Sequence, residues 1–450
     1  MRIITFMVFA LISYTSFSQV MSYNDLGILL SRDNNNGTAR FNALSGAFGA
    51  VGGDISSTNI NPAGAAIAKR NSASVTLMGI NNKYSTDYYG NSFNFESSDT
   101  DISQAGALFS FDSAYNSKWN RFAIYFDYHL KNNFNQNYTA EGYSYPVYDT
   151  HFADTENTAG LFDQNLYQYI QKELLGSSSV FNIGFSSAYE KKLFLGAALK
   201  IHDIELREVA IFEEDNDDID GNILYIEEYN DNYIQATGIS LNFGFIYKFN
   251  KNVRFGLAYE TPAWYQEVIE DYYNELFMDA IDDLEVNDYL DIEDSLDQPF
   301  VFSYRSPSTL TASGAYIFGK KGLISVDYTY KDYTNTRFKN ADFNEENNNF
   351  INNYRNTYAL KVGTEWRFNN LSLRGGASYE KDPNLIIGGG TNEDNIKSYS
   401  LGLGYNFGNS QIDISYANSQ NTNFNGIATN NDLAINNNIS KISGTLTINL

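Results

Sequence analysis

The 450-residue chain carries a formal net charge of -24, and its 35 tyrosines and 32 phenylalanines make it rich in aromatic side chains. A chain this acidic is repelled by phosphates, which excludes nucleic acid as a partner. The absence of cysteine excludes a disulfide framework, so a closed sheet or a large core must stabilise the fold. Charged residues make up only 19% of the chain, against roughly 25% in soluble domains. Many aromatic residues without long apolar runs are typical of a membrane barrel.

Residues 1–18 predict a cleaved signal peptide. Arg2 precedes an apolar run over 3–17, and Ser16 and Ser18 place small residues at the positions that a signal peptidase reads. This run is too short for a spanning helix, and no later stretch approaches the roughly 18 consecutive apolar residues that such a helix needs. The sequence therefore predicts an exported protein without a helical anchor.

Residues 19–72 form a glycine-rich stretch that has neither a strand period nor a helix period over its whole length. Its glycines let the backbone turn sharply or approach another surface closely, and Pro62 fixes the chain near the end of the stretch. The glycine spacing does not fit the G-x-G-x-x-G fingerprint of a dinucleotide site. We interpret the stretch as a plug that the rest of the chain holds in place. The residues that define this plug motif are Gly46, Gly49, Gly52, Gly53, Asn61, Pro62, Ala63 and Gly64.

Residues 73–450 repeat a strand of alternating polarity followed by a turn or a loop. Within 121–131, for example, Phe122, Ile124 and Phe126 alternate with more polar side chains, as expected for a strand between lipid and a polar lumen. Fourteen such strands alternate between short turns and long loops, and their even number allows closure with both chain ends on one side. The predicted fold is all-β, a fourteen-stranded antiparallel transmembrane β-barrel with its short turns in the periplasm. We expect its strands near 73–83, 104–112, 121–131, 179–190, 192–206, 236–249, 252–262, 308–319, 321–332, 355–368, 371–381, 396–408, 410–419 and 440–450.

Four short motifs of the plug, taken together, resemble the N-terminal hatch of the FadL/TodX family of outer-membrane transporters for hydrophobic compounds. These motifs are Gly37 to Arg40, Ser45 to Gly49, Gly52 to Asp54 and Asn61 to Gly64. Strand phrases at 254–262, 325–330, 373–379 and 401–416 are similar to strands of the same family in similar order. The third predicted strand contains neither glycine nor proline, so the sequence does not predict the inward kink that the family has there.

The resemblance implies a hatch inside the barrel and diffusive uptake of long-chain fatty acids or aromatic hydrocarbons. It also implies a location in the bacterial outer membrane. We expect a monomer that contacts outer-membrane lipid and lipopolysaccharide. The rival hypothesis is a related barrel without transport activity, which serves as a secretion-system or surface-attachment partner.

Candidate cargo contacts lie in the hatch and on the lumen face of the barrel. Apolar hatch side chains can touch an apolar cargo, or they can simply pack the hatch against the wall. Lumen charges are most simply read as a network that holds the plug, because barrel interiors are polar, while some of the cations can meet a fatty-acid carboxylate. The candidate substrate-binding residues are Phe41, Leu44, Phe48, Arg254, Lys361 and Arg374.

Two predicted external loops contain apolar residues at helical spacing, over 161–176 and 262–284. We expect short amphipathic helices in both. Their apolar faces would form a landing surface for cargo, or would pack on each other and close the top of the barrel.

A third external loop approximates a twelve-residue calcium-binding loop. Asp218, Asp220 and Glu227 would supply oxygen ligands, with Gly221 at the turn position. The alternative is a solvated acidic turn, because the helices that flank such loops are missing. Apart from this calcium ion we expect no cofactor. With only three histidines and no evident pairing of a serine with one of them, we expect no enzyme activity.

Overall fold

The computed structural model describes residues 21–114, 117–143, 145–147, 151–152, 160–219, 221–281, 288–295, 298–385, 395–425 and 433–450. The predicted signal peptide, residues 1–18, lies outside the described residues. No helix among the residues described is long and apolar enough to cross a membrane.

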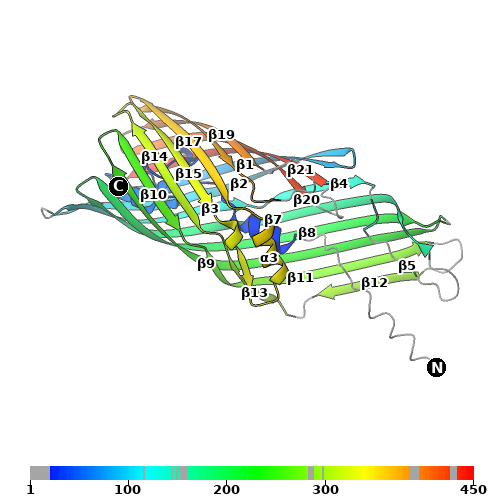
Figure 1. Ribbon diagram of the computed structural model, residues 1–450. Coiled ribbons are helices and arrows are strands. Elements are labelled where there is room, and N and C mark those ends of the chain that lie inside the picture. Colours follow the sequence, from blue (N-terminus) through cyan, green and yellow to red (C-terminus); the bar gives the residue numbers. More distant parts are fainter. Residues whose placement is uncertain are drawn as a thin grey trace.

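Fourteen antiparallel strands close into a barrel, as the sequence predicts (Figure 1). The first strand pairs with the last, from Ser72 opposite Asn449 to Tyr88 opposite Leu433, so the ring has no free edge. The barrel strands are β1 (Ser72–Tyr88), β2 (Asn91–Asp112), β3 (Trp119–Asn133), β7 (Gln164–Tyr189), β8 (Leu193–Asp217), β9 (Ile223–Lys248), β10 (Val253–Glu260), β14 (Thr309–Ile317), β15 (Gly322–Lys331), β17 (Thr357–Phe368), β18 (Leu371–Glu380), β19 (Ile396–Asn406), β20 (Ser410–Asn425) and β21 (Leu433–Asn449).

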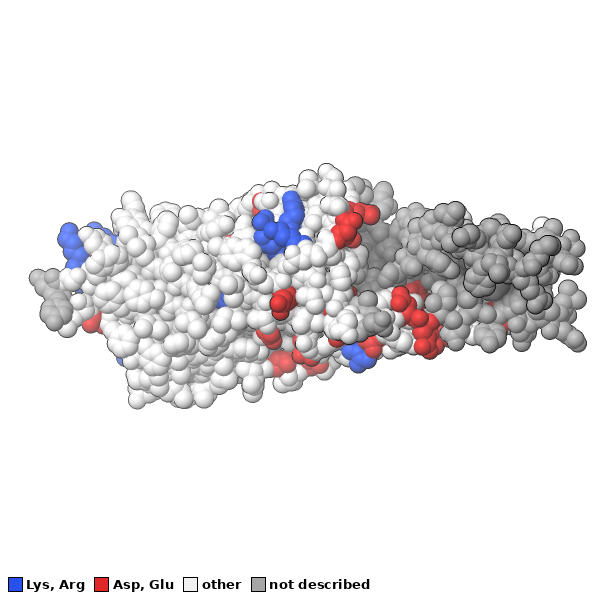
Figure 2. Space-filling model, turned by 90° about the horizontal axis from the view of Figure 1, so that it is seen from below, with Lys and Arg blue, Asp and Glu red and all other residues white. Residues whose placement is uncertain are grey.

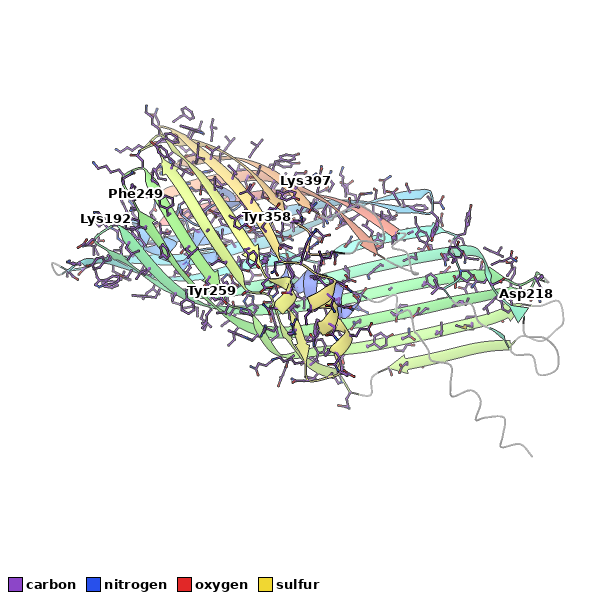
Figure 3. The ribbon with its side chains drawn as sticks, viewed as in Figure 1. Lys192, Asp218, Phe249, Tyr259, Tyr358 and Lys397 are labelled. Carbon is purple, nitrogen blue, oxygen red and sulfur yellow. The ribbon has the colours of Figure 1, made fainter. Side chains whose placement is uncertain are left out.

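The outer wall of the barrel is apolar and its interior is polar, because side chains alternate between the two faces of each strand. Phe122, Ile124 and Phe126 point outward as predicted, whereas Asp127 on the same strand is fully buried inside. Figure 2 shows that one side of this wall is almost free of charged residues between the charges near the short turns and those toward the opposite end. Figure 3 places Phe249 near the first boundary and Tyr259 and Tyr358 near the second, where aromatic girdles are expected.

Three barrel strands continue far beyond the apolar band. β7 and β9 have 26 residues each and β8 has 25, although about 9 to 11 residues suffice to cross a membrane. Their outer halves form a protruding sheet with further strands (Figure 1). These strands are β4 (Gln136–Gly142), β11 (Trp264–Ile281), β12 (Asp288–Ser295), β13 (Phe300–Arg305) and β16 (Arg337–Lys339), and a separate short pair is formed by β5 (His151–Phe152) and β6 (Gly160–Leu161).

The prediction of two amphipathic helices over 161–176 and 262–284 is wrong, because 164–176 and 264–281 are strands of this sheet. Residues 282–284 lie outside the described residues. Residues at every second position of β7 are buried, including Gln168, Ile170 and Leu174. β11 is rich in tyrosine and β-branched residues, which favour strands, and it pairs with β9 along its length. Apolar residues four positions apart lie on one face of a strand as well as on one face of a helix, so this spacing does not distinguish the two. A short helix does lie in another external loop, where α3 spans Asn344–Asn352 after the single turn η5 (Tyr333–Asn335).

The orientation of the barrel can be tested with single cysteines, because the chain has none of its own. Ile219 lies 91% exposed at the tip of the β8–β9 hairpin, whereas Lys320 lies in the short turn between β14 and β15 at the other end. We expect a membrane-impermeant maleimide to label Ile219→Cys in intact cells, and to label Lys320→Cys only after the cells are opened. The cysteine-free parent is the control. Labelling of Lys320→Cys in intact cells would show that the orientation is reversed.

Candidate functional site

Residues 21–71 fold into short helical turns, each started by a side chain that caps it. Ser22 accepts a hydrogen bond from the backbone N–H of Asp25, and Thr38 accepts one from Phe41. Such caps satisfy amide groups that have no partner within a short helix. Asp54 and Asn61 cap the next two turns in the same way. The elements are α1 (Tyr23–Ser31), α2 (Ala39–Asn42), η3 (Ile55–Asn59) and η4 (Pro62–Ile67).

The predicted plug motif connects this N-terminal segment to the wall. The amide Nδ2 of Asn61 donates to the carbonyl of Gly49 at 2.9 Å and to that of Phe245 in β9 at 3.0 Å. The N–H of Gly49 donates to a carboxylate oxygen of Asp327 in β15 at 2.8 Å. Gly52 has a φ of 61°, which favours glycine. One motif therefore contacts β9 and β15 at once. Pro62, Ala63 and Gly64 form the first turn of η4 behind Asn61, and Gly46 and Gly53 also have positive φ values.

A buried charge network holds α2 against the next part of the wall, strands β17, β18 and β20. Nε of Arg40 lies 2.7 Å from Oε2 of Glu365 in β17, and Nε of Arg374 in β18 contacts the same oxygen at 2.7 Å. Arg374 also pairs with Asp413 of β20 at 2.7 Å. Removing one partner from a buried pair costs about 3 to 5 kcal/mol. Arg374, which the sequence predicts to bind cargo, therefore forms ion pairs within this network instead. Arg367 pairs with Glu365 as well.

The other predicted cargo residues of the hatch are packed rather than open to a cavity. The rings of Phe41 and Phe48 lie 5.4 Å apart and are buried. Leu44 is fully buried against the backbone of Gly363 and its neighbours in the wall. Nη1 of Arg254 donates to the carbonyl of Val51 at 2.6 Å. These contacts correspond to packing of the hatch against the wall, the second interpretation that the sequence left open.

Lys361 differs from these residues, because it faces open space in the lumen. It belongs to a set of four lysines, from four strands, that donate hydrogen bonds to residues 30–36 of the N-terminal segment. Nζ of Lys131 donates to the carbonyl of Leu30 at 2.7 Å, and Nζ of Lys441 donates to Oδ1 of Asn36 at 2.8 Å. Lys361 donates to Oδ1 of Asn35, and Lys331 donates to the carbonyl of Ser31 at 3.4 Å.

Two cavities of about 90 Å³ each lie beside this lysine cluster, and Asp33, Asn35 and Lys361 line both. The second of them also contacts Lys131 and Lys331, and the first contacts Lys441. Burial alone would raise the pKa of Asp33, but the surrounding cations, His129 and the lysines, outweigh burial and hold this pKa well below its usual range. The lumen therefore contains four lysines whose charge is partly neutralised by Asp33 and by Glu380, which also lines both cavities.

An aromatic basin lies beyond the lysine cluster, toward the protruding sheet. The ring of Tyr23 lies 5.5 Å from that of Phe302 and 5.0 Å from that of Phe343. The hydroxyl of Tyr304 donates to the carbonyl of Gly27 at 2.8 Å, and Tyr23 donates to Glu270 at 2.7 Å. α1 therefore fills the basin. Its walls include Phe302, Tyr304, Phe338, Phe343, Phe350 and Tyr354.

Sequence reasoning missed this basin and three of the four lysines. The aromatic residues of 333–354 carry a weak signal, since three phenylalanines in a polar, asparagine-rich loop are unusual there. Lys131, Lys331 and Lys441 stand near the external ends of predicted strands, but only the closed barrel shows that they converge.

The third strand contains an irregularity that the sequence did not predict. The register of β3 against β7 shifts between Leu130 and Asn132, and Leu130 is buried instead of facing outward with Phe126. β2 pairs with β3 only as far as Gln104 opposite His129. Beyond that point a groove of about 580 Å³ separates β2 from β4 and β7.

The predicted calcium loop is not assembled by the described residues. Asp218 accepts hydrogen bonds from Asn222 in the hairpin turn, whereas Glu227 lies within β9, paired with Glu213. Four residue steps of a strand separate Glu227 from the start of β9, a distance of about 13 Å. Asp220 lies outside the described residues, and no cluster of three metal-ligating side chains occurs among those that are described. A calcium ion here stays a prediction that the register does not favour.

Comparisons with known proteins agree with this architecture. A sequence model of the family described as outer membrane protein transport protein (OMPP1/FadL/TodX) matches residues 195–448. No curated protein sequence matches the chain. Among solved structures, a Pseudomonas aeruginosa FadL homologue aligns with a TM-score of 0.58 at 13% identity, covering 92% of this chain and 98% of that one.

Two toluene transporters show the same fold. TodX of Pseudomonas putida aligns with a TM-score of 0.55 at 15% identity, covering 93% of this chain and 99% of that one. TbuX of Ralstonia pickettii aligns with a TM-score of 0.52 at 15% identity, covering 92% and 99%. The family model covers more than half of the chain, so this outer-membrane β-barrel belongs to the OMPP1/FadL/TodX family of outer-membrane transport proteins.

Proposed function

We propose that the protein takes up hydrophobic small molecules that carry an anionic group, long-chain fatty acids above all, by passive diffusion through the lumen. The observation that carries this proposal is the lysine cluster around Asp33, which lies next to two cavities and below an aromatic basin. An apolar tail suits the basin, and a carboxylate suits the lysines.

The N-terminal segment must move for cargo to pass. Each cavity measures about 90 Å³, far below the roughly 300 Å³ or more of an ordinary ligand pocket. α1 fills the basin, and residues 30–36 run between the two cavities. We propose that cargo displaces α1 from the basin and that its carboxylate replaces Asp33 among the lysines, which releases residues 30–36.

The lysine cluster favours an acid over a neutral hydrocarbon as cargo. Hydrogen bonds to charged groups contribute about 1.5 to 3 kcal/mol, more than those between neutral groups. Toluene, the compound that TodX and TbuX transport, has no charge and gains nothing from an ammonium group. Fatty acids and aromatic hydrocarbons are therefore expected to respond differently to the same substitution.

Uptake by cells provides the test. We expect the double variant Lys361→Gln with Lys441→Gln to lower uptake of labelled oleate by about tenfold, because glutamine keeps a hydrogen-bond donor and removes the charge. Uptake of labelled toluene is expected to stay the same. Lys320→Gln with Lys321→Gln, in a turn at the opposite end, is the matched control because it removes the same number of charges.

An equal loss for oleate and toluene would contradict the role of the lysines as a carboxylate site. If neither compound enters faster in cells that contain the protein than in cells that lack it, the transport function itself is wrong. The non-transport role in secretion or attachment would then be favoured.

A further inference from the structure

A shallow groove of about 510 Å³ lies on the barrel wall, away from the lumen site, and spans five neighbouring strands at their external ends. β19, β20, β21, β1 and β2 contribute its walls in that order. Its lining is made of lysines, amides and hydroxyls. The side chains that face outward in it include Lys83, Ser85, Lys397, Gln420, Asn436 and Asn438.

One cross-strand row runs through the centre of the groove. Lys397 pairs with Gln420, Gln420 pairs with Asn438, and Asn438 pairs with Lys83. Directly opposite residues point to the same face of a sheet, and these four are all exposed. Three strand spacings separate the two lysines, or about 14 Å. The groove thus has a cation at each end and two amides between them.

The polar side chains of this row are available to a ligand. Lys397 and Gln420 have no hydrogen-bond or ion-pair partner in the described part of the chain. Nζ of Lys83 lies 3.8 Å from Glu96, and both side chains are more than half exposed, so this pair is weak. Nδ2 of Asn418 donates to Oδ1 of Asn438 at 2.6 Å, which fixes the orientation of that amide.

The wall directly below the groove is apolar. Leu401, Ile414 and Ile442 are each more than half exposed on the outward face, one strand after another. The rings of Tyr399 and Tyr416 lie 6.3 Å apart between this apolar surface and the groove, as at a membrane interface. Figure 3 shows Lys397 near the end of the barrel that carries the longer loops. The groove therefore lies at the level of lipid headgroups in the outer leaflet.

We propose that this groove binds an outer-leaflet glycolipid through a phosphorylated saccharide headgroup. Lys83 and Lys397 contact phosphates at the two ends of the headgroup, and the amides between them hydrogen-bond sugar hydroxyls. The acyl chains lie against Leu401, Ile414 and Ile442. In a chain with a formal net charge of -24, two outward lysines provide the local attraction that an anionic lipid needs.

Other occupants fit the groove less well. An apolar cargo molecule would leave the amides without hydrogen bonds, which is costly for buried polar groups. A basic protein would be repelled by both lysines. A free phosphate ion can contact only one of the two lysines at a time, whereas a disaccharide with a phosphate at each end can contact both.

The test uses the full mature protein in detergent, titrated with lipid A, a bis-phosphorylated acylated disaccharide, and followed by native mass spectrometry. We expect Lys83→Gln with Lys397→Gln to weaken binding by about thirtyfold, since each lysine near an anionic lipid surface contributes a several-fold effect. The matched control is Lys320→Gln with Lys321→Gln, which changes the charge equally at the opposite end and should bind as the parent does. Heat-modifiable electrophoretic mobility shows that each variant is folded.

Three further ligands show which part of lipid A, its phosphates or its saccharide, supplies the binding energy. We expect dephosphorylated lipid A to bind the parent as weakly as lipid A binds the double variant, and expect neither phosphatidylglycerol nor inorganic phosphate to compete. Unchanged binding by the double variant, or equally tight binding of dephosphorylated lipid, would overturn the proposal. If phosphatidylglycerol bound as tightly as lipid A, the claim that the groove recognises the saccharide would be overturned. None of these outcomes depends on transport, so failure here and failure of the proposed function are distinguishable.

Discussion

Deleting residues 21–71 is expected to turn a closed barrel into an ion-conducting pore. A barrel of about eight strands is filled by its own side chains, whereas this ring of 14 is wide enough to need other filling. The deleted segment contacts β9 through Asn61, β15 through Gly49 and β17 through Arg40. It also contacts β3 and β21 on the far part of the ring, where Lys131 donates to the carbonyl of Leu30 and the N–H of Ala39 donates to Thr445. Because these contacts surround the lumen, we expect removal of the segment to leave a water-filled passage.

Planar-bilayer recording measures this effect directly. The parent is expected to be almost silent, and the deletion variant to show long-lived openings with a conductance typical of a wide pore. Heat-modifiable mobility is the control for barrel closure, because the ladder of hydrogen bonds from β21 to β1 does not involve the segment. A current no larger than that of the parent would mean that residues 21–71 do not block the lumen.

The sequence was sufficient to predict the barrel, because its evidence is local. Alternation of apolar and polar side chains in a stretch such as 121–131 requires one apolar face and one polar face, whatever lies next to it. Short turns such as that at 319–322 could be placed for the same reason. All fourteen predicted strands are therefore found, although β7, β8 and β9 extend well beyond the predicted limits.

The external sheet could not be predicted from local pattern. Over 161–176, Phe162, Leu166, Ile170 and Leu174 recur four positions apart, and this spacing is compatible with a helix or with every second position of a strand. The deciding factor is the neighbouring strand, since Leu174 of β7 lies opposite Glu208 of β8 over a pairing that continues for the whole hairpin. Tertiary pairing thus overrode a local helical pattern.

The candidate site was only partly predictable for a related reason. Lys361 could be placed in the lumen by the register of its own strand, but its convergence with Lys131, Lys331 and Lys441 depends on how four strands are staggered around the ring. The break in β3 at Leu130 lies beside contacts with the N-terminal segment, such as the hydrogen bond from Nδ2 of Asn132 to the carbonyl of Arg32 at 2.8 Å. Neither feature has a signature in the nearby sequence.

Glycines in the barrel wall allow close contact with the N-terminal segment, and one added side chain at such a glycine would disrupt this contact. Gly244 of β9 lies so close to Asn61 that a Cβ atom there would stand 2.2 Å from Oδ1 of Asn61. β9 is hydrogen-bonded on both sides, to β8 and β10, so it cannot move away. The segment must yield instead, because each of its hydrogen bonds contributes only about 1 kcal/mol.

Gly244→Leu is therefore expected to dislodge the plug motif without unfolding the barrel. The hydrogen bonds of Asn61 to Phe245 and Gly49 would be lost, and bilayer recordings should show openings that the parent lacks. Cells should also become sensitive to large polar antibiotics that the outer membrane normally excludes. The abundance of the protein in the membrane should stay unchanged, since the new side chain does not touch the hydrogen bonds between strands.

The matched control is Gly444→Leu, the same substitution at an outward position of β21. Nothing lies within 4 Å of a Cβ atom at Gly444, and its neighbours on that face, Ile442 and Leu446, already point outward. Bilayer recordings of this variant are expected to show the same low conductance as those of the parent. If Gly244→Leu were as silent as Gly444→Leu while both reach the membrane in equal amounts, contact between Asn61 and the wall would not be what holds the lumen closed.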